Sequence, residues 1–152
     1  MPAVISIVIA LIAVAVAIGA WFRPAPKPET PAVKTYSEQE VADAKKAVCD
    51  AFLTVHNGVR INTGRNGGTD PTATLAVAAN ARLSLYGGGG YMSDVLEQHP
   101  ATPKELADAV NQLSEVFRKL AIGYLADVSD TDLEPSLQQA DNATVAVKNA
   151  CQ

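Results

Sequence analysis

Apolar residues recur at helical spacing along most of the chain after residue 36. In 41–59, 106–124 and 133–151 they follow one another at steps of three and four residues. Such spacing places apolar residues on one side of an α-helix, which can bury that side against a neighbouring helix. The predicted core positions are Val41, Ala44, Val48, Phe52, Val55 and Val59; Leu106, Val110, Leu113, Phe117, Leu120 and Tyr124; and Leu133, Leu137, Ala140, Thr144, Val147 and Cys151.

A further helical segment, 71–96, contains four consecutive glycines at 87–90. Each glycine in a helix interior costs about 1 kcal/mol relative to alanine. The tract therefore indicates either a hinge between two shorter helices or a place where another backbone approaches closely. A stripe of apolar side chains precedes it and predicts the buried side of this segment: Leu75, Ala79, Leu83 and Tyr86.

Capping sequences mark where the helices begin. Residues 37–40 form a capping box, in which a serine hydroxyl and a glutamate satisfy the first backbone N–H groups. Residues 70–71 place an aspartate cap before a proline at the first helical position. Residues 102–105 combine both devices, whereas the start near 131–135 is less sharply defined. Between the first two helices, 64–68 is a glycine-rich loop.

Four amphipathic segments with short connections predict an all-α fold, an up-down-up-down antiparallel four-helix bundle in 36–152. The low aromatic content of 5% and the lack of alternating Val/Ile/Thr runs argue against a sheet. This topology brings the end of the chain back beside the first helix, so that Cys151 approaches Cys49. A disulfide closes when the two Cα atoms lie within about 7 Å. Two buried free thiols are the alternative to that bond.

The N-terminal segment 3–22 predicts a single transmembrane helix. Its twenty residues carry no charge and end beside Trp21, and at 1.5 Å per residue they span roughly 30 Å, the thickness of the hydrocarbon core. A cleaved signal peptide is the alternative, although such peptides usually have a basic start and a shorter apolar run. Residues 23–35 contain four prolines and predict an extended linker of up to roughly 40 Å.

Two features of the sequence predict opposite orientations of that segment. Residues 23–35 have a net charge of +2, which the positive-inside rule places in the cytoplasm. A disulfide, in contrast, requires an oxidising compartment. We give the disulfide more weight and expect a single-pass protein of the cell membrane, with its C-terminal domain extracytoplasmic, in the periplasm.

The charge of the domain disfavours nucleic acid as a partner. Residues 36–152 carry nine Lys or Arg against fifteen Asp or Glu, a balance of −6, and such a surface repels phosphate backbones. No Walker or dinucleotide motif surrounds the glycines, and no nucleophile has a recognisable activating partner. We therefore expect a protein that is not an enzyme and binds no cofactor.

Metal binding is also disfavoured. Neither cysteine has a CxxC neighbour, and His56 and His99 show no ligand spacing. The acidic residues in 127–134 lack the spacing of a calcium loop, and carboxylates are common near helix N-termini because of the helix dipole. These histidines and carboxylates are read as solvated or capping residues.

The glycine tract and its large neighbours form the candidate contact site. Close packing or a bend explains the glycines structurally, whereas a ligand or partner contact would explain the flanking side chains as well. The expected function is an interaction module, an accessory or scaffold subunit of a cell-envelope membrane complex; the alternative is a binder of a small apolar ligand, lipid or haem, at a hinge. The candidate residues are Tyr86, Gly87, Gly88, Gly89, Gly90, Tyr91 and Met92.

Two stretches carry a resemblance to a known family. Residues 75–92 (LAVAANARLSLYGGGGYM) and 101–115 (ATPKELADAVNQLSE) resemble alanine- and proline-rich single-pass membrane proteins of mycobacteria. The resemblance extends over most of the chain, including the apolar segment, the proline-rich stretch and both cysteines. It implies an envelope protein that faces the periplasm, and it carries over no catalytic residue.

Overall fold

The structure, a computed structural model, describes residues 35–152 and is all-α in that part. The four helices are α2 (Glu38–Thr63), α3 (Pro71–Gln98), α4 (Lys104–Leu125) and α5 (Asp130–Cys151). Residues 36–152 form one compact unit. The predicted transmembrane segment, 3–22, and the predicted linker up to residue 34 lie outside the described residues. Within residues 35–152, no helix has both the length and the hydropathy needed to cross a membrane.

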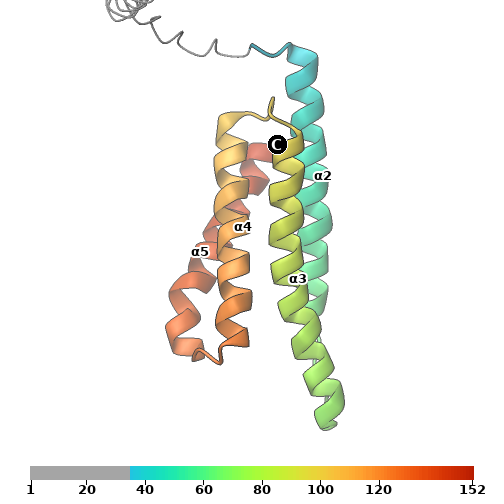
Figure 1. The fold of residues 1–152 in the computed structure, drawn as a ribbon, viewed down its shortest axis with the longest axis vertical. Helices are drawn as coiled ribbons and strands as arrows, with labels where there is room; N and C mark the ends of the chain where they lie inside the picture. Colours follow the sequence, from blue (N-terminus) through green and yellow to red (C-terminus); the bar gives the residue numbers. More distant parts are fainter. Residues whose placement is uncertain (1–34) are drawn as a thin grey trace, which may run out of the picture. The chain divides into compact units, whose positions relative to one another are not determined.

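Successive helices run antiparallel, which confirms the predicted helical bundle (Figure 1). The extensive interfaces join α2 to α3, α3 to α4, and α4 to α5, whereas α2 and α5 meet over a much smaller area. Each helix therefore packs mainly on the helices next to it in sequence, and the contact between the first and the last helix is small.

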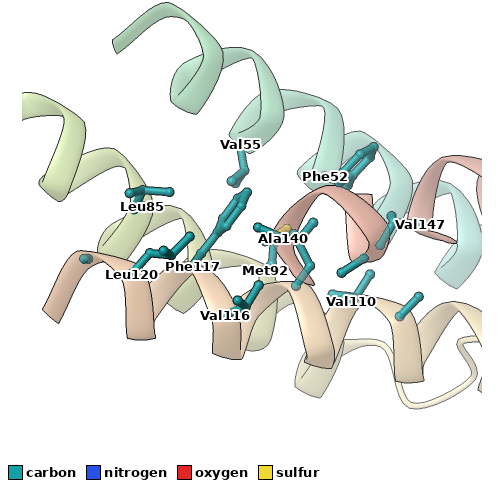
Figure 2. Packing of buried hydrophobic residues seen from close by; sticks show 14 of the residues in the cluster. Phe52, Val55, Leu85, Met92, Val110, Val116, Phe117, Leu120, Ala140 and Val147 are labelled. Atoms are coloured by element: carbon teal, nitrogen blue, oxygen red, sulfur yellow. The ribbon is translucent and has the colours of Figure 1, made fainter. Parts of the chain in front are cut away.

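Helix α4 supplies more buried residues than any other helix because it packs against both α3 and α5. Its predicted seam is buried from Leu106 to Leu120, and Tyr124 at the end is half-buried. Phe117 extends from α4 toward Val55 of α2 (Figure 2). A second buried row on α4 was not among the predicted positions; it consists of Ala109, Ser114, Val116 and Ala121.

The first two helices begin as the capping sequences predict. Ser37 accepts a hydrogen bond from the backbone N–H of Glu40, whose carboxylate accepts one from the backbone N–H of Ser37 at 2.7 Å. Asp70 accepts a hydrogen bond from the N–H of Thr72 at 2.8 Å and precedes Pro71. These bonds satisfy N–H groups that have no partner inside the helix.

The predicted cap of the third helix was wrong. Helix α4 begins at Lys104 without a side-chain cap, and the Thr102 hydroxyl instead donates to the His99 carbonyl at 2.7 Å. That hydroxyl therefore stabilises the turn between α3 and α4 and does not cap α4. Helix α5 begins at Asp130, where Ser129 caps the N–H of Asp132 at 3.2 Å.

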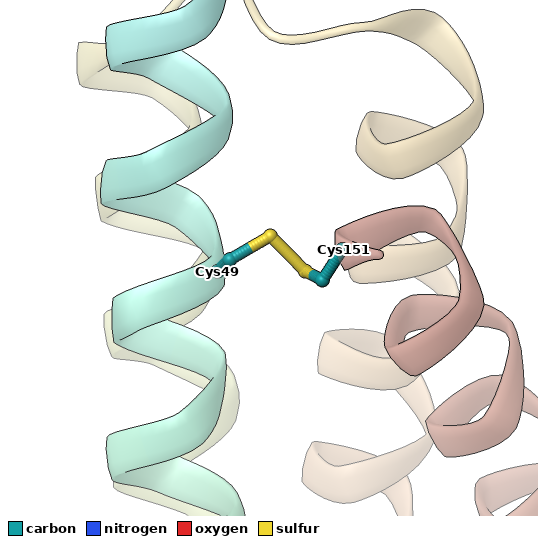
Figure 3. The surroundings of a disulfide bond; sticks show 2 residues. All are labelled: Cys49 and Cys151. Carbon is teal, nitrogen blue, oxygen red and sulfur yellow. A yellow bond between two sulfur atoms is a disulfide. The ribbon is translucent and has the colours of Figure 1, made fainter.

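The disulfide between Cys49 and Cys151 is present, as predicted (Figure 3). The two Cα atoms lie 5.8 Å apart although the residues are 102 positions apart in sequence. The bond joins α2 to the last turn of α5, two helices that meet over a much smaller area than the successive pairs do. No free cysteine remains in residues 35–152.

Candidate functional site: the outer face of α3

The glycine tract does not form a hinge, because α3 is continuous from Pro71 to Gln98. Another backbone approaches closely at one of the four glycines, Gly89, and a side chain of a neighbouring helix packs closely on a second, Gly88. A Cβ atom on Gly88 would lie 2.6 Å from Cγ1 of Val55 in α2, and one on Gly89 would lie 2.7 Å from the carbonyl oxygen of Ser114 in α4. These two positions therefore allow α3 to pack tightly against both neighbours.

The other two glycines have no such role in the described part of the chain. A Cβ atom on Gly87 or Gly90 would meet no other side chain or distant backbone within 4 Å. Each nevertheless costs about 1 kcal/mol relative to alanine in a helix interior. Packing within residues 35–152 therefore does not offset this cost in stability at Gly87 or Gly90.

The apolar stripe predicted for the core of α3 was wrong, because it lies on the outer side of the helix. Leu75 is 66% exposed, Leu83 67% and Tyr86 52%. The buried side is formed by Leu85, Gly89 and Met92 instead. Both sides of α3 are apolar, so the spacing of apolar residues is compatible with either orientation.

Charge is sparse along this outer side. In residues 71–93 the one charged residue is Arg82, and Asp94 and Glu97 follow near the end of the helix. A continuous exposed surface of large apolar and small residues typically marks an interaction site. We call this surface the α3 outer face; it comprises Leu75, Ala79, Leu83, Tyr86, Gly87, Gly90 and Tyr91.

The structure separates the predicted candidate residues into two groups. Tyr86 and Tyr91 are about half exposed and lie on the α3 outer face with Gly87 and Gly90. Met92 is buried in the core and is 1% exposed. The large side chains around the glycines therefore do not converge on one ligand site.

A concave surface, which the sequence patterns did not indicate, lies between α2 and α5 at the disulfide. Its cavity has a volume of about 730 Å³. Residues from 42–53 of α2 and from the C-terminal end of α5 line this groove, which we call the disulfide groove: Ala42, Lys45, Lys46, Cys49, Asp50, Phe52, Leu53, Lys148, Cys151 and Gln152.

His56 lies one turn beyond Phe52 on α2, and the two rings stack with centroids 5.5 Å apart. Partial burial lowers the pKa of His56 from its ordinary value of 6.5, and the positive charges of Lys148 and Arg60 lower it further. The folded protein thus favours the neutral imidazole.

The depressed pKa of His56 predicts a loss of stability in mild acid. The unfolded chain binds a proton on this imidazole more readily, so the free energy of unfolding should fall as the pH drops below 6.5. Urea denaturation at about pH 7.5 and about pH 5.5 measures this change, and His56→Gln should make the decrease smaller. An equal decrease in the variant would assign the effect to other groups.

The remaining titratable residues in the described part of the chain do not assemble into a metal site. Among residues 35–152, no three His, Cys, Asp or Glu side chains are grouped closely enough to hold an ion. The acidic residues of 127–134 are exposed at the start of α5, where Asp132 and its neighbours belong to the helix cap.

Fold and surfaces together define an all-α domain of four helices with one disulfide, an exposed apolar helix face and a groove bordered by lysines. Comparison with protein-family models, with curated proteins and with solved structures finds no match for the chain.

Proposed function

We propose that the chain is a membrane-anchored extracytoplasmic interaction module, an accessory or scaffold subunit of a cell-envelope membrane complex. The α3 outer face is the observation that carries this proposal. The apolar segment 3–22 supports membrane attachment. The disulfide supports an oxidising compartment outside the cytoplasm.

The α3 outer face suits a helix of a partner protein. Gly87 and Gly90 leave the α3 backbone uncovered, so a second helix can approach it closely between the side chains of Leu83, Tyr86 and Tyr91. The contacts of that helix would offset the cost of the two glycines. Burying the exposed leucines and tyrosines would add roughly 25 cal/mol per Å² of apolar surface.

The distribution of charge on α3 indicates what kind of surface the partner presents. The uncharged stretch of the face requires an uncharged apolar surface on the other side, since an unpaired buried charge is costly. Asp94 and Glu97 lie at the C-terminal end of α3 and favour basic residues there. The domain's balance of −6 disfavours a second copy, because two acidic domains repel each other.

Site-directed photocrosslinking in native membranes tests the proposal. A benzoylphenylalanine replacing Tyr86 should form an adduct with one other protein through an apolar helix of that protein. The same group replacing Glu115, which is exposed on α4, is the control and should not form this adduct. In a Gly87→Leu/Gly90→Leu background the Tyr86 adduct should be lost, because the added side chains fill the space for the partner helix.

Two results would overturn the assignment. An adduct with the mass of two copies of this chain would identify self-association instead of a partner subunit. An adduct that persists at full yield after the double leucine substitution would show that the glycines do not form the contact. Circular dichroism of the variant checks that its helices are intact.

The small-ligand alternative at the glycine tract has no specific observation in its favour. It was based on a hinge, and α3 is continuous there. None of Tyr86, Tyr91 and Met92 lines the disulfide groove or the three smaller cavities found beside α3, α4 and α5 in residues 35–152.

A further inference from the structure

The disulfide groove has the size and the wall chemistry of a ligand site. Its volume of about 730 Å³ falls within the range of about 300–1,000 Å³ that is usual for small-molecule pockets. Phe52, Leu53 and the disulfide form an apolar wall, and Leu53 is 52% exposed although it lies in this concave surface. A ligand that covers Leu53 would remove this apolar surface from water.

Three of the nine cationic residues in 36–152 border this one groove. Lys46 is paired with Asp50, their charged atoms lying 2.6 Å apart. Lys45 and Lys148 take part in neither of the two ion pairs found in the described residues. The groove thus presents two uncompensated positive charges on a domain that is acidic as a whole.

The sequence around each lysine explains why it has no partner on its own helix. Ion pairs on helices form between residues three or four positions apart. Every residue at those positions is uncharged: Val41, Ala42, Val48 and Cys49 around Lys45, and Thr144, Val145, Cys151 and Gln152 around Lys148. Both ammonium groups are therefore left for a ligand.

We propose that the disulfide groove binds a single-chain carboxylate amphiphile, a molecule of the fatty-acid type. Its hydrocarbon chain lies along Phe52, Leu53 and the disulfide, and its carboxylate accepts hydrogen bonds from Lys45 and Lys148. Charge-assisted bonds of this kind are about twice as strong as neutral ones. The cavity volume suits one acyl chain better than the two chains of a phospholipid. This site is on a different surface from the α3 outer face and does not depend on the proposed function.

Photolabelling of the full chain in phosphatidylcholine nanodiscs tests the assignment. The probe is a palmitate analogue with a diazirine in its chain, and the matched uncharged probe is its methyl ester. We expect the carboxylate probe to label peptides that contain 42–53 and 148–152. Labelling by the ester should be weaker by about tenfold, which corresponds to the loss of about 1.4 kcal/mol of binding free energy.

A pair of charge-matched variants separates the groove from general electrostatic attraction. Lys45→Gln/Lys148→Gln should lower labelling by the carboxylate probe by about tenfold. Lys104→Gln/Lys119→Gln removes the same charge from exposed positions on α4 and should leave labelling unchanged. Neither lysine of the groove is in the core, so circular dichroism should show the same helix content in both variants.

Four outcomes would overturn the proposal. Equal labelling by the acid and the ester would show that the lysines do not bind the carboxylate. An equal effect of the two variants would show that overall charge, not the position of the lysines, determines labelling. Displacement of the probe by phosphatidylglycerol added to the nanodisc would assign the groove to a phospholipid headgroup instead of a free carboxylate. Labelling confined to other peptides would place the binding elsewhere.

Discussion

Replacing both Cys49 and Cys151 by alanine is expected to lower the free energy of unfolding by about 3 kcal/mol, with an upper limit near 4.7 kcal/mol. The disulfide connects residues 102 positions apart, so its loss frees a long loop and raises the conformational entropy of the unfolded chain. Domains of this size are typically stable by about 5–15 kcal/mol, which makes this a large share. Urea denaturation of the oxidised protein and the double variant measures the difference.

The loss should also be visible locally, in the last helix. Helix α5 packs extensively on α4 but meets α2 over a small area, so the disulfide is the main connection between the first and last helices. Hydrogen exchange should accelerate in 143–151 more than in 106–120 of α4. Adding a reductant to the wild-type protein is the control and should reproduce both effects. An unchanged denaturation midpoint would show that direct packing, not the disulfide, holds α5 in place.

The sequence predicted the elements best where one side of a helix is polar. Helix α4 has one apolar side and one charged side, so its predicted core positions from Leu106 to Leu120 are confirmed as buried. The disulfide followed from the same reasoning, because an antiparallel bundle returns Cys151 to the level of Cys49. Periodicity predicts burial reliably when a single orientation of the helix hides its apolar residues.

Helix α3 shows why the same reasoning failed there. Large side chains point outward at Leu75, Leu83 and Tyr86, whereas the buried side consists of Leu85, Gly89 and Met92. At Gly88 the bundle gains close packing of the Val55 side chain, and at Gly89 it gains a close approach of the α4 backbone. A prediction from hydrophobicity alone assigns these larger residues to the core and therefore buries the wrong side of α3.

The disulfide groove was beyond prediction for a different reason. Its walls come from two helices that are far apart in sequence, and its shape depends on how far α2 and α5 diverge. One sequence signal was available, the absence of acidic residues at helical spacing around Lys45 and Lys148. That signal identifies unpaired cations, but only the fold shows that they border the same cavity.

Substituting leucine at Gly89 and at Gly90 is expected to have opposite effects on stability. At Gly89, the first added carbon would already lie 2.7 Å from the carbonyl oxygen of Ser114 and 3.0 Å from Cγ of Arg118. A backbone oxygen of a packed helix cannot move aside cheaply, so α3 and α4 must separate. We expect a loss of about 3 kcal/mol in the free energy of unfolding, the upper end of the usual cost of overpacking.

Gly90→Leu is the matched control, with the same new side chain one residue further along the helix. Its Cβ would meet nothing within 4 Å, so leucine should raise the free energy of unfolding by roughly 0.8 kcal/mol through its better helix propensity. The two variants should therefore differ by about 4 kcal/mol in urea denaturation. Similar stabilities would contradict the contrast between Gly89, which is packed against α4, and Gly90, which has open space around it. A Gly90→Leu protein that is more stable yet no longer forms the Tyr86 adduct would separate folding from binding, because only contact with a partner then explains a glycine at that position.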